Sequence, residues 1–142
     1  ARFRRGEAGL AMEFGRPGIA TRLSEVEKMT KALAAVGVIL EKKNPVYDLL
    51  ADPATGAFKP EVMNERVLSA IVEVKAPAER LPEMLAVAKQ IASTIDTVFS
   101  LDVITRVADD GTIPLLEAIE QAGFQARPNA KVNLGLGKPL IP

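Results

Sequence analysis

Residues 67–107, VLSAIVEVKAPAERLPEMLAVAKQIASTIDTVFSLDVITRV, decide the fold of this chain. Apolar and polar side chains alternate over 67–75 and again over 98–107, which is the pattern of strands with one buried face. Between these runs, residues 78–94 carry an apolar stripe at helical spacing, next to prolines that the start of a helix tolerates. The stretch therefore predicts a strand–helix–strand unit. The helical stripe consists of Leu81, Met84, Leu85, Ala88, Ile91 and Ala92.

A second helix and a last extended segment are expected after this unit. Residues 108–111, ADDG, are a turn signal, and residues 113–122 repeat a helical stripe that ends at Gly123, where a left-handed C-cap belongs. Residues 124–134 are expected to return as a strand at the sheet edge, because Pro128 cannot donate to a central ladder. A right-handed crossover through the first helix makes the first two strands parallel.

The N-terminal part of the chain is less regular. Residues 1–23 are predicted to be an irregular arm, in which residues 8–14, AGLAMEF, are compatible with a short strand. A helix is expected to begin at Ser24, because Ser24 and Glu27 have the spacing of a capping box, in which each side chain accepts from a free backbone N–H. Gly37 is the expected end of this helix.

The connection to the strand–helix–strand unit leaves one alternative open. Residues 36–43 are compatible both with a strand and with a continuation of the preceding helix. A short helix is predicted over 45–51, because Asn44 is a good N-cap and Pro45 suits the first helical position. Residues 52–56, DPATG, are predicted to form a loop.

These elements are expected to form a single domain over residues 1–142, a length that buries a core without disulfides. The order of elements predicts an α+β fold and resembles a ferredoxin-like two-layer sandwich, a βαβ core with the helices packed on one face of a small mixed sheet. The expected parts are an irregular arm (1–23), a helical and mixed part (24–66), the strand–helix–strand–helix–strand core (67–133) and an extended C-terminal tail (134–142).

The composition excludes several kinds of chemistry. The chain has no cysteine and no histidine, which excludes thiol nucleophiles, Ser-His-Asp triads and nearly all catalytic zinc sites. We expect no metal and no cofactor, and the composition leaves only an all-oxygen metal site open. The 18 Lys and Arg side chains balance 18 Asp and Glu, so the positive surface that binds nucleic acid is not expected.

The expected location of the protein follows from two further absences. No apolar run is long enough to span a membrane, and the N-terminus has no apolar segment of the kind found in signal peptides. A cytoplasmic location is therefore expected. Whether the chain, which begins at Ala1, is a whole protein or a piece of a longer one is left open.

The stretch NLGLGKPL, residues 133–140, contains the glycines and lysine of a phosphate-binding loop, but it does not match one. A P-loop requires glycine where this chain has Val132, and serine or threonine where it has Pro139. An extended apolar tail that docks on the body, or on a neighbouring subunit, is the better interpretation.

The predicted sheet face opposite the helices carries the main candidate site. Strand alternation places Glu73, Lys75, Asp102 and Arg106 on this face. Arg106 is the predicted anion clamp, because the guanidinium fork matches carboxylate and phosphate groups. Glu73 or Asp102 is the predicted catalytic base, provided that burial raises its pKa. The competing interpretation is a sheet face that solvent or another subunit covers.

Two further sets of polar residues are candidates for ligand binding. Lys43 lies in the segment EKKN, residues 41–44, and Tyr47 lies close to it. The competing interpretation is that lysines at the end of a helix stabilise its dipole. Arg127 and Lys131 alternate along the predicted edge strand, where charges also prevent unwanted strand pairing.

Two functions from different classes follow. The first is a small homo-oligomeric ligand-binding, regulatory or assembly module, favoured because the usual catalytic residue types are missing and an open sheet face needs a cover. The second is a metal-independent isomerase or lyase that moves a proton on a small anionic metabolite through Glu73 or Asp102. We expect a homo-oligomer and a small anionic ligand, and neither nucleic acid nor a membrane as partner.

Overall fold

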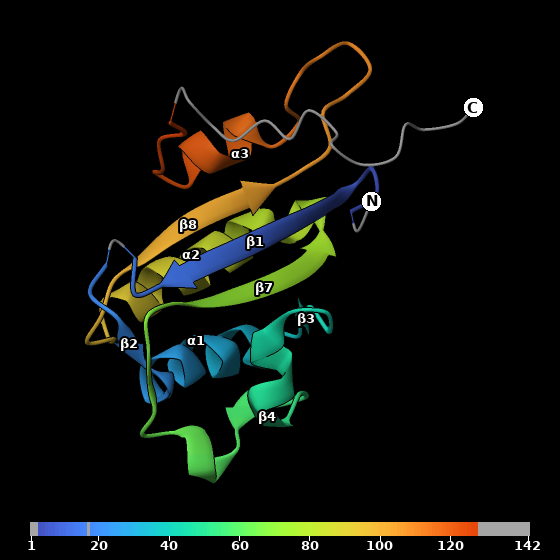
Figure 1. The fold of residues 1–142 in the computed structure, drawn as a ribbon. Coiled ribbons are helices and arrows are strands. Elements are labelled where there is room, and N and C mark those ends of the chain that lie inside the picture. The colour runs from blue at the N-terminus through green and yellow to red at the C-terminus, as the bar shows by residue number, and fades with distance from the viewer. Residues whose placement is uncertain (1–2, 17, 128–142) are drawn as a thin grey trace.

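The computed structural model describes residues 3–16 and 18–127. Its centre is a four-stranded sheet in the order β3-β7-β1-β8 (Figure 1). These strands are β1 (Glu7–Phe14), β3 (Ile39–Leu40), β7 (Ala70–Pro77) and β8 (Phe99–Ile104). Together with three α-helices within the described residues, they make the chain a mixed α+β protein.

The central strand of the sheet comes from the N-terminal arm. The short strand that the sequence allows over 8–14 is confirmed as β1, so residues 1–23 are not irregular throughout. β1 lies between β7 and β8 and pairs antiparallel with both. The expected mixed sheet is therefore wrong, because every pairing in this sheet is antiparallel. β7 and β8 run in the same direction, as a crossover requires, but β1 separates them.

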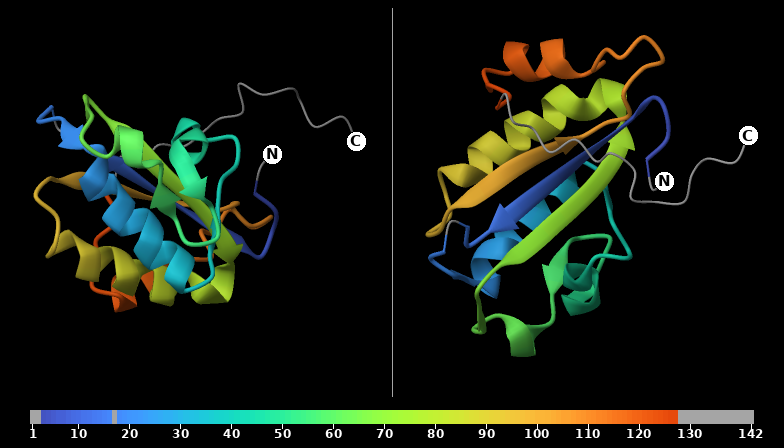
Figure 2. Two further views of the ribbon diagram at one scale, coloured as in Figure 1. Left: turned by 90° about the horizontal axis from the view of Figure 1, so that it is seen from below. Right: turned by 45° about the horizontal axis from the view of Figure 1, so that its top comes forward.

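Two helices, α1 (Leu23–Ala35) and α2 (Leu81–Ala92), pack against each other and lie on the same side of the sheet (Figure 2). The sequence predicts α2 well, because the expected range, 78–94, contains α2 and the 3-10 turn that precedes it, η3 (Ala78–Arg80). Full burial of one aliphatic side chain contributes about 1.5–3 kcal/mol, so this layer dominates the stability. The fully buried side chains between helices and sheet include Leu10, Met12, Phe14, Met29, Leu33, Leu81, Met84 and Leu85.

The capping box predicted for the start of α1 is wrong. The helix begins one residue earlier, with Arg22 at the N-cap position and no side-chain capping bond. Glu27 instead points away from the helix start, and its Oε1 accepts from the backbone N–H of Phe58 at 2.9 Å. The helix ends at Ala35, just before Gly37, which has a φ of +72° and confirms the expected stop.

The open alternative over 36–43 is resolved in favour of a strand, since Ile39 and Leu40 form β3 at one edge of the sheet. The next element is a 3-10 helix, η1 (Pro45–Leu49), rather than an α-helix. Its N-cap prediction is confirmed, because the Asn44 side chain accepts from the N–H of Val46 at 2.9 Å.

A small hairpin inserted after η1 packs on α1. It consists of β4 (Leu50–Asp52) and β5 (Ala57–Phe58), joined by the loop that the sequence predicts. Thr30 in α1 donates its hydroxyl proton to the carbonyl of Gly56 at 2.6 Å. The chain then passes through η2 (Pro60–Val62) and β6 (Arg66–Val67), which pairs with β2 (Thr21–Arg22) before β7 begins.

The last described helix, α3 (Leu116–Gln121), is shorter than the expected range and packs on α2. The predicted C-cap is confirmed: Gly123 has a φ of +78°, its N–H bonds to Glu120 O, and the N–H of Phe124 bonds to Ile119 O. These two bonds are a Schellman motif. No strand forms over 124–127, and the rest of the predicted edge strand lies outside the described residues, as do 133–140.

Candidate functional site

The sheet face opposite the helices carries the carboxylates that the sequence singles out. Ala11 in β1 lies opposite Glu73 on one side and opposite Asp102 on the other. Glu73 and Asp102 therefore share a face, as strand alternation predicts. Two strand spacings separate their backbones by about 10 Å, so each carboxylate has different neighbours. Glu73 is 8 % exposed, whereas Asp102 is exposed.

One end of this face is closed by the N-terminal arm. The ring of Phe3 lies directly against Gly9, and a Cβ atom at position 9 would come within 2.3 Å of it. Phe3 is only 9 % exposed as a result. Nearby, the ammonium of Lys75 pairs with the carboxylate of Glu7 at 3.4 Å, across neighbouring strands. The open face is thus partly occupied by the protein itself.

Glu73 meets Tyr47 in a small crevice beside β7. The crevice also receives side chains from Glu41 and Asn44, and its volume is about 10 Å³. That volume corresponds to about one water molecule. The amide oxygen of Asn44 already accepts from Val46, so it serves the start of η1. The crevice brings together two predicted site residues, but it has no room for a metabolite in this conformation.

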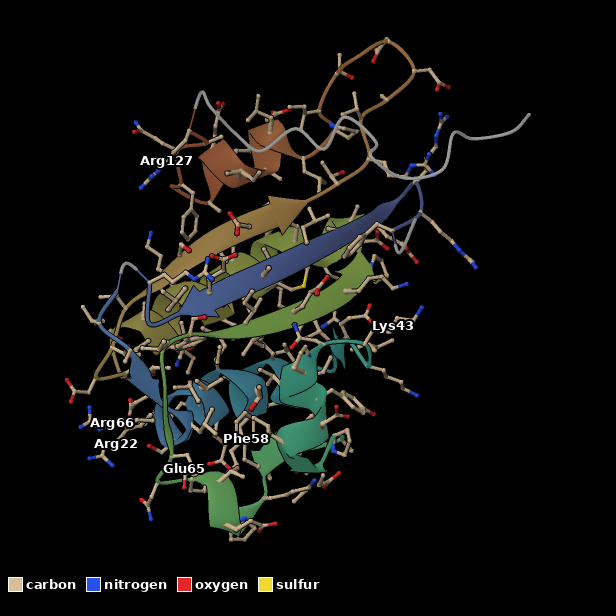
Figure 3. All side chains as sticks on the ribbon, viewed as in Figure 1. Arg22, Lys43, Phe58, Glu65, Arg66 and Arg127 are labelled. Atoms are coloured by element: carbon tan, nitrogen blue, oxygen red, sulfur yellow. The ribbon has the colours of Figure 1, made fainter. Side chains whose placement is uncertain are left out.

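The remaining predicted ligand residues lie apart. Lys43 is exposed beside β3, and Arg127 is exposed beyond α3, on the other side of the molecule (Figure 3). Arg106 is exposed after the end of β8. Lys131 lies outside the described residues. Within the part of the chain that the structure describes, these cations do not converge on one ligand position.

A bidentate surface ion pair joins the N-terminal arm to the turn after β8. The guanidinium of Arg5 donates to both carboxylate oxygens of Asp109, one of them at 2.8 Å. This hydrogen bonding, reinforced by the charge attraction, holds the pKa of Asp109 below its usual value, and Arg106 adds a smaller effect. Both partners are exposed, so the pair fixes the arm rather than forming a reactive site.

A hollow larger than the Glu73 crevice lies elsewhere, between α2, β8 and the chain that follows α3. This groove has a volume of about 330 Å³. Its walls are Ala88, Lys89 and Ala92 of α2, Phe99 and Leu101 of β8, and Phe124. Ile95, Thr97 and Val98 of the connecting segment complete it.

Local sequence features hold the walls of the groove in place. Alanines at 88 and 92 lie one turn apart on α2 and leave space where larger side chains would fill it. Phe99 stacks obliquely on the fully buried Phe14, with 5.1 Å between ring centroids. The Schellman motif at Gly123 turns Phe124 back toward α2, where its ring lies 5.6 Å from the ammonium of Lys89.

The sequence predicts the positions of some groove residues, but it does not predict the groove itself. Ala88 and Ala92 belong to the predicted apolar stripe, and Gly123 is the predicted cap, but neither observation locates Phe124. The one local signal is that the stripe of α2 has two small side chains, Ala88 and Ala92, one turn apart near its C-terminal end. A hollow between residues 88–101 and Phe124 depends on how α2, β8 and the chain after α3 pack together, which periodicity does not reveal.

The described residues contain neither a metal-binding cluster nor a membrane-spanning helix. No set of three acidic side chains there could hold a metal ion. No helix in residues 3–16 and 18–127 has both the length and the apolar character needed to cross a bilayer.

Comparisons of the chain with protein-family models, with curated proteins and with solved structures found no match. The geometry of the groove and of the carboxylate face is therefore the basis for any functional conclusion.

Proposed function

We propose that this protein is a ligand-binding module that holds a small, largely apolar molecule in the groove between α2, β8 and Phe124. The observation that supports this is the volume of about 330 Å³. Ligand pockets are typically apolar hollows of about 300–1,000 Å³ with a few polar groups. The walls of the groove fit that description, since seven of the nine are Ala, Ile, Val, Leu or Phe.

The fold favours such a role. We infer that the domain belongs to the ferredoxin-like type, because two strand–helix–strand halves interleave in the order β3-β7-β1-β8. In this arrangement β8 is an edge strand, so α2 has no further strand to cover beyond it. The space beside an edge strand is filled by α3 and Phe124 only in part.

The enzyme alternative has less support. It requires a substrate between an anion clamp and Glu73 or Asp102, but Arg106 lies beyond the end of β8 and the Glu73 crevice holds about 10 Å³. The homo-oligomeric state, the cytoplasmic location and the lack of nucleic-acid and membrane partners remain predictions. Analytical ultracentrifugation would test the first of them.

The test uses N-phenyl-1-naphthylamine, an uncharged dye whose fluorescence rises in apolar surroundings. Ala92 lines the groove and is exposed, so Ala92→Phe adds a ring to the groove without entering the core. The matched control is Ala86→Phe, at an exposed alanine of the same helix that does not line the groove. We expect Ala92→Phe to weaken dye binding about tenfold or more, a change of about 1.4 kcal/mol, and Ala86→Phe to leave it unchanged.

All three proteins need equal unfolding midpoints, because a loosened core also binds apolar dyes. No saturable dye binding by the wild-type chain, or equal affinities in both variants, would contradict the proposal.

A further inference from the structure

The polar groups of the groove limit the chemistry of its ligand, if the proposed function holds. Only Lys89 and Thr97 among the nine lining residues have polar side chains. The hydroxyl of Thr97 donates to the carbonyl of Ala20 at 3.4 Å, so its proton is directed away from the groove. The ammonium of Lys89 is then the main donor available to a ligand, and it carries a full positive charge.

Lys89 differs from Lys28, Lys31 and Lys75, which each pair with a carboxylate within 3.4 Å, and from Lys59, whose ammonium donates to the carbonyl of Asp48 at 2.7 Å. Within residues 3–16 and 18–127, no carboxylate pairs with Lys89, and its recorded contact is the ring of Phe124. A cation–π contact of this kind supplies no negative charge, so the exposed ammonium can still pair with an anion.

The position of Lys89 has an alternative explanation that the test must separate. A lysine in the last turn of a helix stabilises the helix dipole, whatever lies beside it. That role requires only a positive charge near the end of α2. It does not require the ammonium to lie over an aromatic ring at the rim of a groove.

We infer that the ligand of the groove is an amphipathic monoanion, a compact apolar body with one carboxylate or sulfonate-like group. The body packs on Phe99, Leu101 and Phe124, while the anionic group accepts from the Lys89 ammonium at the rim. One cation matches one negative charge. A second charge would lie against the apolar walls, where burial without a partner is costly.

A pair of matched dyes tests the inference. 1-Anilinonaphthalene-8-sulfonate has the ring system of N-phenyl-1-naphthylamine plus one sulfonate, so the ratio of their affinities isolates the effect of the charge. In the wild-type protein we expect the sulfonate to bind about fivefold more tightly, the upper range for an ion pair at an exposed site. The ratio should fall as salt rises from about 20 mM to about 500 mM, because the Debye length shortens.

Variants then assign the charge effect to Lys89. Lys89→Gln should reduce the affinity ratio to about one, and Lys89→Arg should keep most of it, since both cations pair with an anion. Lys42→Gln, at an exposed lysine remote from the groove, is the control for net charge and should keep the wild-type ratio. A role limited to the helix dipole would lower the stability of Lys89→Gln without changing the ratio.

The possible failures are distinct. If the uncharged dye binds and Ala92→Phe blocks it, but the ratio is one or does not depend on Lys89, the inference about the anion is overturned and the ligand-binding module stands. If neither dye binds, or if Ala92→Phe has no effect on either, the proposed function is overturned together with the inference.

Discussion

The two main helices lie on the same face of the sheet, but their outer covers differ. The β4–β5 hairpin is fastened to α1 by polar contacts, in which Glu27 accepts from the Phe58 backbone and Thr30 donates to Gly56 O. α3 is held on α2 by partly buried apolar side chains, and it leaves the groove beside Phe124. The difference teaches that directional bonds, added to the burial of Leu50 and Phe58, close the hairpin onto α1, whereas the apolar cover formed by α3 leaves a hollow beside α2.

The largest effect on stability is expected from a substitution that separates the β4–β5 hairpin from α1. Gly56 has a φ of +72°, and a Cβ atom there would lie 2.3 Å from Thr30 O, in the backbone of α1. Gly56→Ala therefore has to strain the left-handed backbone and separate the hairpin from the helix. We expect a loss of about 3 kcal/mol in the free energy of unfolding, measured by urea denaturation.

Gly37 is a matched control for this experiment. Its φ is also +72°, but no atom lies within 4 Å of the position a Cβ would take. Gly37→Ala should therefore cost only the backbone strain, about 1 kcal/mol. Equal losses in the two variants would show that the hairpin is not fastened as tightly as these contacts indicate.

These contacts also explain where sequence reasoning succeeds and where it stops. Alternation over 67–75 and 98–107 correctly predicts that β7 and β8 exist, but not their bounds. β7 begins only at Ala70, Leu68 is 86 % exposed, and β8 ends at Ile104. The capping box fails because the Glu27 carboxylate bonds to Phe58, 31 residues away, and no local spacing announces such a partner.

The candidate site shows the same limit. Alternation correctly places Glu73 and Asp102 on one face, but it cannot reveal that β1 lies between them, because that strand comes from the distant N-terminal arm. The groove depends on Phe124, which reaches α2 only through the turn at Gly123. The sequence therefore predicts which residues form each element, but it does not predict which elements contact one another in the fold.

A smaller effect is expected where α1 is joined to the chain that follows α2. Glu25 in the first turn of α1 accepts from the Lys28 ammonium at 2.7 Å and from the backbone N–H of Asp96 at 2.8 Å, just after α2. Burial alone would raise the pKa of Glu25, but these hydrogen bonds and the charge of Lys28 outweigh it and hold the pKa below its usual value. The folded pKa is thus lower than the unfolded one.

The sign of the pH dependence follows from that order. The stabilisation by Glu25 is fully present above the unfolded pKa and is lost as the pH falls through the folded pKa. Glu25→Gln should lose about 1–2 kcal/mol at neutral pH, and its deficit relative to the wild type should shrink on acidification below about pH 4.5. Urea denaturation at several pH values measures this, with the exposed Glu61→Gln as control. A deficit that stays constant with pH would exclude the charged form as its cause.

The smallest effect on stability is expected at α3, the loose apolar cover of α2. This effect sharpens the comparison of the two covers most. Gly123 has a φ of +78°, and a Cβ atom there would meet only the Lys89 ammonium, at 3.5 Å. Gly123→Ala strains the turn that directs Phe124 into the groove. Because α3 has six residues at the periphery and can open locally, the loss in global stability should stay below about 1 kcal/mol.

Binding should nevertheless respond, because Phe124 forms one wall of the groove. We expect Gly123→Ala to weaken binding of N-phenyl-1-naphthylamine about threefold, a change of about 0.7 kcal/mol. Gly111→Ala, with a φ of +83° and open space around its Cβ position, imposes similar strain on a turn that does not line the groove. Its dye affinity should match that of the wild type. If the two variants bind the dye equally, the position of Phe124 does not define the groove, and the loose cover is a passive surface rather than part of a ligand site.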